Sequence, residues 1–323
     1  MRITKFTTLF IAFTILLILF ACSEDDYLTD VAQQEGEESA ALGELTIGLM
    51  PAIDSFPIVI AHYRDYFADE GLIVNLEPFS SPSDRDAALQ AGHLDATLFD
   101  LVAVGLFHEA DIIPLRAGGS TTGRFSLVAD AGFETIADLA GETVVIAQNT
   151  AIDFILDQMI ELAGFDEYHI ETLAIPAIPA RLEYLRAGNV AAALLPEPWA
   201  TIAIAEGFYE ITNTIEIGVN PFVIAFTDEA VATMPEEIRA FYRAYDRAVD
   251  YLNTNDLADY FYIMVDIIGF PEEVADDLIL PSFTHNQMPE DHVLDAALSW
   301  LLARDLITEG MTTADLVNSV AFD

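Results

Sequence analysis

The chain has 323 residues, of which 54 are acidic and 12 are basic, so its formal net charge at pH 7 is −42. With 53% hydrophobic residues it can bury a core large enough for two lobes, which excludes a disordered protein. The strong negative charge excludes nucleic acid and anionic lipid surfaces as natural partners.

The first 22 residues have the layout of a secretory signal. A basic start precedes an apolar run from Phe6 to Phe20, which is too short for a comfortable membrane span, and the only cysteine, Cys22, follows Ala21. The letters LFAC resemble a bacterial lipobox, although Phe20 departs from its usual small residue. We predict a signal peptide over residues 1–21 and a lipid anchor at Cys22; the alternative is an ordinary signal peptide with an incidental cysteine.

Residues 22–43 are acidic and poor in large apolar side chains, which predicts a disordered tether. About 20 flexible residues have a typical end-to-end distance of about 25 Å, enough to hold a folded domain clear of a membrane. These features predict an extracytoplasmic protein that is lipid-anchored to a bacterial cell membrane and faces the periplasm or the cell surface.

The folded part begins with alternating strands and helices. Apolar patterning and turn residues predict a strand over 45–50, a helix over 55–71, a strand over 72–79, a helix over 84–92 capped by Ser83, and a strand over 94–100. This order is typical of parallel βαβ units.

The same order returns about one hundred residues later. Strands are predicted over 143–148, 171–176 and 190–198, with helices over 154–165 and 180–188 between them. The phrase LQAGHLDATLFD of the first set matches LRAGNVAAALLPEP of the second, which indicates two lobes of one design. The alternative is that helix, glycine cap and strand recur in any α/β protein.

Two stretches rich in Gly, Pro and Asn, 118–130 and 218–228, have the composition of segments that cross between lobes. Helices that open with Pro and two acids are expected from Pro235, Pro271 and Pro289, and they should complete the first lobe. The predicted domains are lobe I over 44–125 and 222–323, and lobe II over 126–221.

Ligands of open α/β sheets bind beyond the carboxyl ends of the strands, often at helix N-termini. For several positions there is a structural alternative: the acids and serines can cap helices, and the aromatic residues can pack in the core. The residues at the strand ends and crossings form the predicted ligand-binding set: Asp54, Ser55, Phe56, Ser80, Ser81, Phe99, Asp100, Thr121, Thr122, Asn149, Thr150, Glu197, Trp199 and Asn220.

The sequence contains none of the catalytic motifs considered. It has no Gly-x-Ser-x-Gly elbow, no phosphate loop and no cysteine beyond Cys22, and its six histidines lack metal-ligand spacing. We therefore expect no catalytic residue, no metal and no cofactor, and predict that the protein is not an enzyme.

The ordered phrases LTIGLMPAIDSFPIVIAHYRDYFADEG, TTGRFSLVAD, DLAGETVVIAQNTAIDFILD and LRAGNVAAALLPEPWAT resemble the solute-binding proteins of ABC importers, within the NMT1/THI5-like group. The resemblance implies an α/β, periplasmic binding protein-like fold with two βαβ lobes joined by a two-segment hinge (type II). It implies a monomer that closes over one small molecule and delivers it to the permease and ATPase subunits of an importer. Some family members are enzymes that depend on a lysine, but the only lysine here is Lys5, in the predicted signal peptide.

Two kinds of ligand remain open. Sulfonates or nitrate would need N–H groups or arginine, whereas aromatic side chains beside carboxylates suit a neutral or cationic heteroaromatic molecule. We favour a thiamine-precursor-like heteroaromatic; the alternatives are a small anion, or a ligand-sensing surface lipoprotein that is not coupled to transport. The arginines near the predicted cleft are Arg85, Arg116, Arg124 and Arg181.

Overall fold

A computed structural model describes residues 42–165, 170–278 and 280–322. The predicted signal peptide, the anchor at Cys22 and nearly all of the predicted tether lie outside these residues. The last two tether positions are held on the folded part: the Leu42 N–H donates to the Gly71 carbonyl (2.9 Å), and the Gly43 N–H donates to Glu237 Oε1 (2.9 Å). No helix of the described residues is long and apolar enough to cross a membrane.

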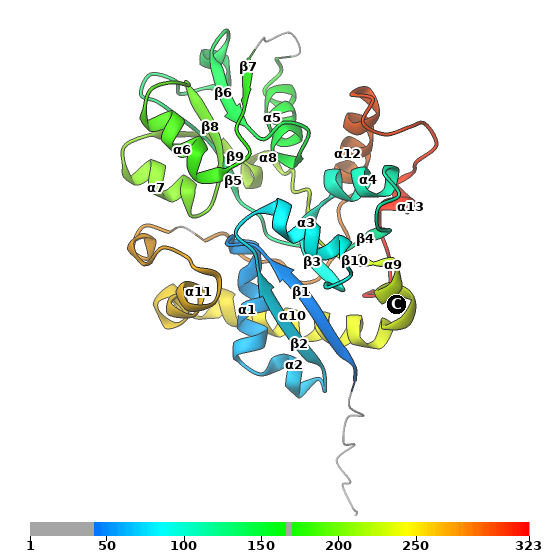
Figure 1. Ribbon diagram of the computed structural model, residues 1–323. Helices are drawn as coiled ribbons and strands as arrows, with labels where there is room; N and C mark the ends of the chain where they lie inside the picture. The colour runs from blue at the N-terminus through cyan, green and yellow to red at the C-terminus, as the bar shows by residue number, and fades with distance from the viewer. Residues whose placement is uncertain (1–41, 166–169, 279, 323) are drawn as a thin grey trace, which may run out of the picture. The chain divides into compact units, whose positions relative to one another are not determined.

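The strands form two five-stranded sheets (Figure 1). In lobe I the order is β2-β1-β3-β10-β4, with β1, β2 and β3 parallel and β10 antiparallel to both of its neighbours. The apolar run that predicted the first strand is buried because helices cover the sheet. The strands are β1 (Glu44–Leu49), β2 (Ile73–Pro78), β3 (Ala96–Asp100), β4 (Leu115–Ser120) and β10 (Phe222–Thr227).

Lobe II repeats this arrangement with the order β7-β6-β8-β5-β9. Again three strands are parallel, and the strand that arrives from the other lobe, β5, runs antiparallel to β8 and β9. The predicted two-lobed α/β fold with a two-segment hinge is therefore confirmed. The strands are β5 (Phe125–Ala129), β6 (Thr143–Ile146), β7 (Glu171–Ala174), β8 (Ala192–Pro196) and β9 (Tyr209–Asn213).

The helices of the first half of lobe I differ in detail from the prediction. The single helix expected over 55–71 is broken, because Asp65 adopts the left-handed conformation with φ 58°. The next helix begins earlier than expected, and Ser81, not Ser83, caps it by accepting from the Asp84 N–H. The elements are η1 (Ile53–Ser55), α1 (Phe56–Tyr63), α2 (Tyr66–Asp69), α3 (Pro82–Gln90) and α4 (Leu101–Glu109).

Both helices predicted for lobe II are present, although the first begins three residues earlier than expected, and η2, α7 and α8 were not predicted. Thr150 caps the first long helix by accepting from the Ile152 N–H (3.2 Å). The elements are η2 (Ile136–Leu139), α5 (Ala151–Leu162), α6 (Ile178–Arg186), α7 (Trp199–Ala205) and α8 (Thr214–Ile217).

The chain after the second crossing is helical, with one error in the prediction. The helix expected over 271–280 is only the single turn η4, since Asp276 and Asp277 favour turns and Pro281 disfavours a helical residue before it. The elements are α9 (Asp228–Thr233), α10 (Pro235–Thr254), η3 (Leu257–Asp259), α11 (Phe261–Ile268), η4 (Glu272–Val274), α12 (Asp291–Ala303) and α13 (Thr313–Leu316).

A buried arginine in each lobe explains much of the doubled sequence phrase. Arg85 of α3 donates to the Leu98 carbonyl of β3 (3.0 Å), and Arg181 of α6 donates to the Leu194 carbonyl of β8 (2.8 Å). Both bonds span thirteen residues. In each lobe a positive-φ glycine, Gly92 or Gly188, then turns the chain back toward the strand. The repeat is thus a structural unit that ties helix to sheet.

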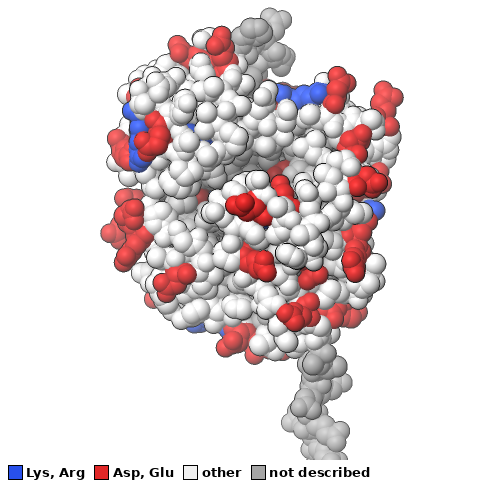
Figure 2. Space-filling model, viewed as in Figure 1, with Lys and Arg blue, Asp and Glu red and all other residues white. Residues whose placement is uncertain are grey.

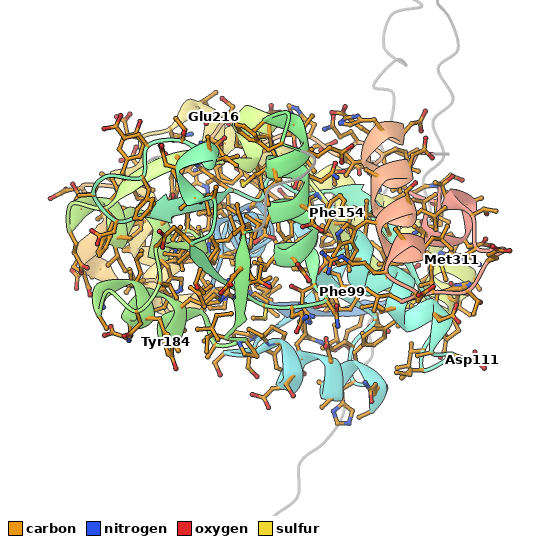
Figure 3. The ribbon with its side chains drawn as sticks, turned by 90° about the horizontal axis from the view of Figure 1, so that it is seen from above. Phe99, Asp111, Phe154, Tyr184, Glu216 and Met311 are labelled. Atoms are coloured by element: carbon orange, nitrogen blue, oxygen red, sulfur yellow. The ribbon has the colours of Figure 1, made fainter. Side chains whose placement is uncertain are left out.

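Helix α12 packs on both lobes, which the sequence did not predict. Trp300 packs edge-on against Phe154 of α5, with 5.9 Å between ring centroids, and its indole N–H donates to Asp157 (2.7 Å). Figure 3 shows Phe154 between α5 and α12. One hydrophobic cluster accordingly runs from α4 through α12 to α5, so the C-terminal helices do more than complete lobe I.

Candidate ligand-binding site

Two crossing segments, 121–124 and 214–221, join the lobes and are clamped to each other. The Asn220 side chain donates to the Thr121 carbonyl, and the rings of Phe125 and Phe222 stack with centroids 4.5 Å apart. A Cβ at Gly123 would lie 2.3 Å from the Phe222 ring, so glycine is required there. The predicted site residue Asn220 therefore acts inside the hinge.

The segment before α12 runs beside the first crossing. The Thr284 N–H donates to Thr122 Oγ1 (3.0 Å), and the Ser120 N–H donates to the Gln287 carbonyl (2.8 Å). Thr122 is thereby committed to a protein partner. The hinge consists of these crossings and the C-terminal segment laid against them.

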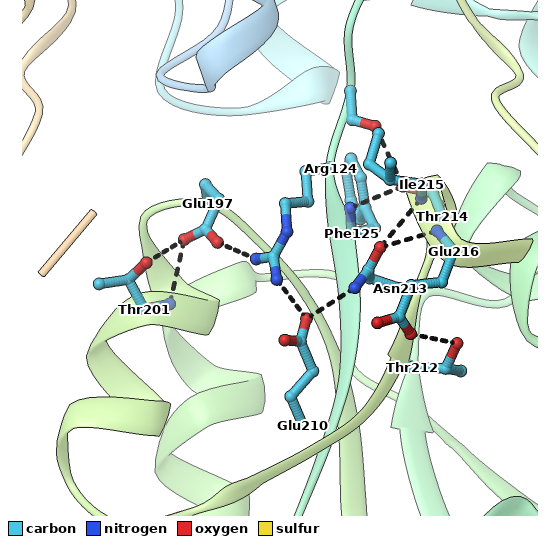
Figure 4. A network of polar contacts seen from close by, with 11 residues as sticks. Arg124, Phe125, Glu197, Thr201, Glu210, Thr212, Asn213, Thr214, Ile215 and Glu216 are labelled. Carbon is cyan, nitrogen blue, oxygen red and sulfur yellow. Dashed lines mark hydrogen bonds and ion pairs between the residues drawn. The ribbon is translucent and has the colours of Figure 1, made fainter. Parts of the chain in front are cut away.

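On the lobe II side of the hinge, Glu197 is fully buried in a polar network (Figure 4). It accepts from the Thr201 N–H (3.0 Å) and hydroxyl (2.7 Å) and forms an ion pair with Arg124, which also pairs with Glu210 (2.5 Å). Burial raises the pKa of Glu197, while Thr201 and Arg124 oppose the rise. Glu197 thus fixes the first turn of α7, where Trp199 begins the helix.

Trp199 lies partly exposed at this helix start and packs against the small hydrophobic cluster of lobe II. Three residues further on, Ile202 packs against clusters of both lobes, so α7 faces lobe I. The helix that Trp199 begins therefore contacts lobe I through Ile202.

On the lobe I side, Asp54 sits in η1 beyond the carboxyl end of β1 and is 7% exposed. Its Oδ1 atom is buried without a hydrogen-bond partner among the described residues, and so is Thr121 Oγ1. Burial raises the pKa of Asp54 to about 7 against the opposing effects of nearby backbone N–H groups, Arg85 and Thr121. These two predicted site residues retain hydrogen-bonding capacity that the protein does not use.

Two further groups of this kind were not predicted from the sequence. The Tyr245 hydroxyl of α10 and Asn286 Oδ1 are also buried without a partner in the described part of the chain. Burial raises the pKa of Tyr245 well above its usual value, with Tyr242 and Asp54 adding to the rise. Helical periodicity marks Tyr245 as a core residue and gives no sign that its hydroxyl lies near a carboxyl group.

The remaining predicted residues are packed, serve as caps or are exposed. Ser55 donates to the Met50 carbonyl (2.6 Å), and Asp100 caps α4 by accepting from the Ala103 N–H (2.8 Å), with burial raising its pKa to about 6. Phe56 and Phe99 are buried among other side chains, and the guanidinium of Arg85 covers the Phe99 ring. Ser80 and Asn149 are exposed.

The four arginines considered as anion ligands all have protein partners. Besides the pairs already described, Arg85 binds Asp86 and Arg116 binds Asp228. Arg181 also donates to the Pro176 carbonyl (3.3 Å). Figure 2 shows the surface hollowed between the lobes, with acidic side chains at its margin. The described residues contain no group of three or more His, Cys, Asp or Glu that could hold a metal ion.

Two matching sheets and a double crossing between them define a periplasmic binding protein-like α/β protein. The model of the NMT1/THI5-like family matches residues 52–256, so the chain belongs to this family.

Three known proteins are similar to this chain. The formylaminopyrimidine-binding protein of Halalkalibacterium halodurans is 22% identical over 287 residues, 83% of this chain and 87% of that protein. The alkanesulfonate-binding protein SsuA of Xanthomonas axonopodis pv. citri, bound to MOPS, has a TM-score of 0.69 at 18% identity, covering 85% and 98% of the two chains. The desulfurization enzyme DSZB has a TM-score of 0.61 at 14% identity, covering 86% and 97%. The structural matches show the fold alone.

The raised pKa of Asp54 predicts a pH-dependent stability. Well below pH 4 the carboxyl is protonated in both states; as pH rises toward 7, only the unfolded state ionises, so the free energy of unfolding of wild type should fall by up to about 4 kcal/mol. Asp54→Asn abolishes this titration, although Arg85 and Tyr245 still face the site. Urea unfolding should therefore show that the free energy of unfolding of Asp54→Asn rises relative to that of wild type between pH 4 and 7.

Asp138→Asn serves as a control of opposite sign, since Thr135 lowers the pKa of Asp138. That variant should lose stability relative to wild type as pH rises through the Asp138 pKa. A pH-independent difference for Asp54→Asn would contradict the assignment of Asp54 as a buried, mostly protonated carboxyl.

Proposed function

We propose that this protein is the extracytoplasmic solute-binding component of an ABC importer, and that it captures a thiamine-precursor-like N-heterocycle between its lobes. One observation carries the choice of ligand: the guanidinium groups of Arg85, Arg116, Arg124 and Arg181 all bind protein groups and, of the four, only Arg181 has a buried nitrogen, Nε, without a partner among the described residues, whereas Asp54 and Thr121 hold unused polar oxygens in the hinge region. A buried acceptor without a partner favours a ligand that donates hydrogen bonds over an anion.

Trp199 complements this polar group from the other lobe. Its ring is partly exposed on α7, which packs toward lobe I, so it can cover the face of a flat ring whose edge meets Asp54. A ligand that contacts both lobes stabilises their closed arrangement by its differential affinity. The named relative that binds formylaminopyrimidine supports this ligand class.

A small anion is the second candidate, supported by the sulfonate-binding structural neighbour and by the helix N-termini of α1 and α5, which follow the first strand of the parallel part of each lobe. The carboxyl group of Asp100, which is largely ionised at pH 7, opposes it electrostatically. No catalytic step is proposed: the relatives that give the family its ligand classes are binding proteins. The protein acts as a monomer and is held to the membrane by a lipid at Cys22. Detergent partitioning of the native protein tests the lipid anchor.

The full chain, purified in detergent, should be stabilised by pyrimidines and not by taurine, alkanesulfonates or nitrate in a thermal-shift screen. At a free ligand concentration of 100 Kd the expected gain is about 2.7 kcal/mol. Trp199→Ala should weaken pyrimidine binding at least about 10-fold through lost ring contact. Ile204→Ala, at an exposed position on the same helix, should leave the affinity unchanged.

If only a sulfonate or nitrate stabilises the protein, the ligand is a small anion and the proposed heterocycle is wrong. Unchanged pyrimidine affinity in Trp199→Ala would confine Trp199 to packing within lobe II.

A further inference from the structure

Six side-chain atoms are buried without a partner among the described residues, and four of them gather around the hinge. Thr121 lowers the pKa of Asp54 as a hydrogen-bonding neighbour, and the charge of Asp54 raises the pKa of Tyr245, which places the three groups together. Asn286 adjoins Gly119, two residues before Thr121, because its Oδ1 atom lies 2.2 Å from where a Gly119 Cβ would be. The unused groups therefore come from four separate parts of the chain.

This clustering differs from incidental loss of hydrogen bonds. A buried polar atom without a partner costs folding free energy, and native proteins contain few such atoms. Polar groups at comparable positions do have hydrogen-bond partners. Tyr242, one turn before Tyr245, accepts from the Gly119 N–H (2.6 Å). Asp153, the lobe II counterpart of Asp54, accepts from the Asn149 N–H (2.9 Å). A cluster of buried polar atoms without partners is expected where a bound ligand would supply the missing hydrogen bonds.

The chemistry of the set selects one edge of a ligand. A carboxyl group offers two oxygens side by side, and the hydroxyl of Thr121 can donate or accept. A heteroaromatic ring with a ring nitrogen next to an exocyclic amino group presents the matching pair. A protonated carboxyl donates to the ring nitrogen and accepts from the amine, whereas a carboxylate accepts from both when the ring carries the proton.

We propose that Asp54, together with the neighbouring Thr121 and Tyr245, forms a subsite for an N-heterocycle. Its carboxyl group would form two parallel hydrogen bonds, one with a ring nitrogen and one with the adjacent amino group. This inference rests on the proposed function and adds the group on the protein that selects the ligand. The raised pKa of Asp54 agrees with it, since a carboxyl that titrates near neutral pH can pair with this edge in either protonation state.

Isothermal titration calorimetry on the full chain tests the subsite with two probes, 4-amino-2,5-dimethylpyrimidine and 2,4,5-trimethylpyrimidine, in which a methyl group replaces the amine. The exchange of amine for methyl removes the hydrogen-bond donor while the shape is kept, so the carboxyl oxygen that would accept from the amine is left unpaired. Wild type should bind the amino compound at least about 100-fold more tightly, as expected when a buried polar group is left unpaired by the wrong ligand.

Three variants separate hydrogen bonding from shape and charge. Asp54→Leu should lose at least about 100-fold affinity for the amino compound, and Thr121→Val about 3- to 10-fold. Asp54→Asn should stay within about 10-fold of wild type, because an amide can accept from the amine and donate to the ring nitrogen. Asp266→Leu, at an exposed position of α11, is the matched control and should not change binding.

Equal affinity of wild type for the two probes, or unchanged binding in a folded Asp54→Leu variant, would overturn the subsite and leave the importer function standing. If wild type binds neither pyrimidine but binds a sulfonate or nitrate, the proposed ligand class fails as well. Thermal melting of each variant, with Thr121→Val as the least disruptive change, verifies that the loss is one of binding.

Discussion

Replacing Arg124 with methionine is expected to lower the free energy of unfolding by about 3 to 5 kcal/mol. The reason is that Glu197 is fully buried and Arg124 is its only cationic partner in the described structure, so the substitution leaves a carboxylate uncompensated in the interior. Arg239→Met, which removes an exposed pair with Glu236, should cost less than about 1 kcal/mol. Urea unfolding at pH 7 measures both.

The pH dependence gives an independent check on this prediction. Burial already raises the pKa of Glu197, and removing Arg124 raises it further. The deficit of Arg124→Met should shrink as pH falls and Glu197 takes up a proton in the folded state. The double variant Arg124→Met with Glu197→Met should recover much of the loss. A loss below about 1 kcal/mol in the single variant would show that this pair is no stronger than a surface one.

Replacing Trp300 with alanine is expected to cost about 3 to 5 kcal/mol, the range for a buried tryptophan. The side chain is 8% exposed and joins α12 of the C-terminal segment to α5 of lobe II through the Phe154 ring and the Asp157 carboxylate. Leu162→Ala, at an exposed position on α5, should change stability by less than about 0.5 kcal/mol. Equilibrium unfolding followed by circular dichroism compares the two variants.

Trp300→Phe separates packing from the hydrogen bond, because it keeps an aromatic ring and removes the indole N–H. It should cost less than alanine, since Asp157 still pairs with Arg304 (2.5 Å). A cost below about 1 kcal/mol for Trp300→Ala would mean that α12 does not hold the two lobes together.

The fold was largely readable from the sequence because its elements obey local rules. Apolar runs bounded by Gly and Pro mark nearly every strand, and the helix-glycine-strand phrase repeats where the lobes repeat. The errors arose where one residue decides the backbone: Asp65 takes a left-handed conformation that breaks a continuous amphipathic pattern, and the short turn η4 replaces an expected helix.

The site was harder to predict because most of its residues are shared between folding and binding. Strand-end reasoning placed Asp54 and Thr121 at the junction of the lobes, and both have unused polar atoms there. The same reasoning could not distinguish Asp54 from Glu197, which resembles it in type and position but is paired with Arg124. Tyr245 and Asn286 were missed because their contributions come from elements distant in the chain.

The sequence by itself determined the α/β class, the two-lobe repeat and the family resemblance, since these depend on hydrophobic periodicity, turn residues and short ordered motifs. Only the tertiary structure decided which polar groups are free. Whether a carboxyl or guanidinium is satisfied depends on partners that come from other elements: Arg85 and Arg181 bind strand carbonyls thirteen residues on, while Asp54 has a buried oxygen with no partner in the described chain. Local sequence patterns do not show which groups from other elements come within hydrogen-bonding distance.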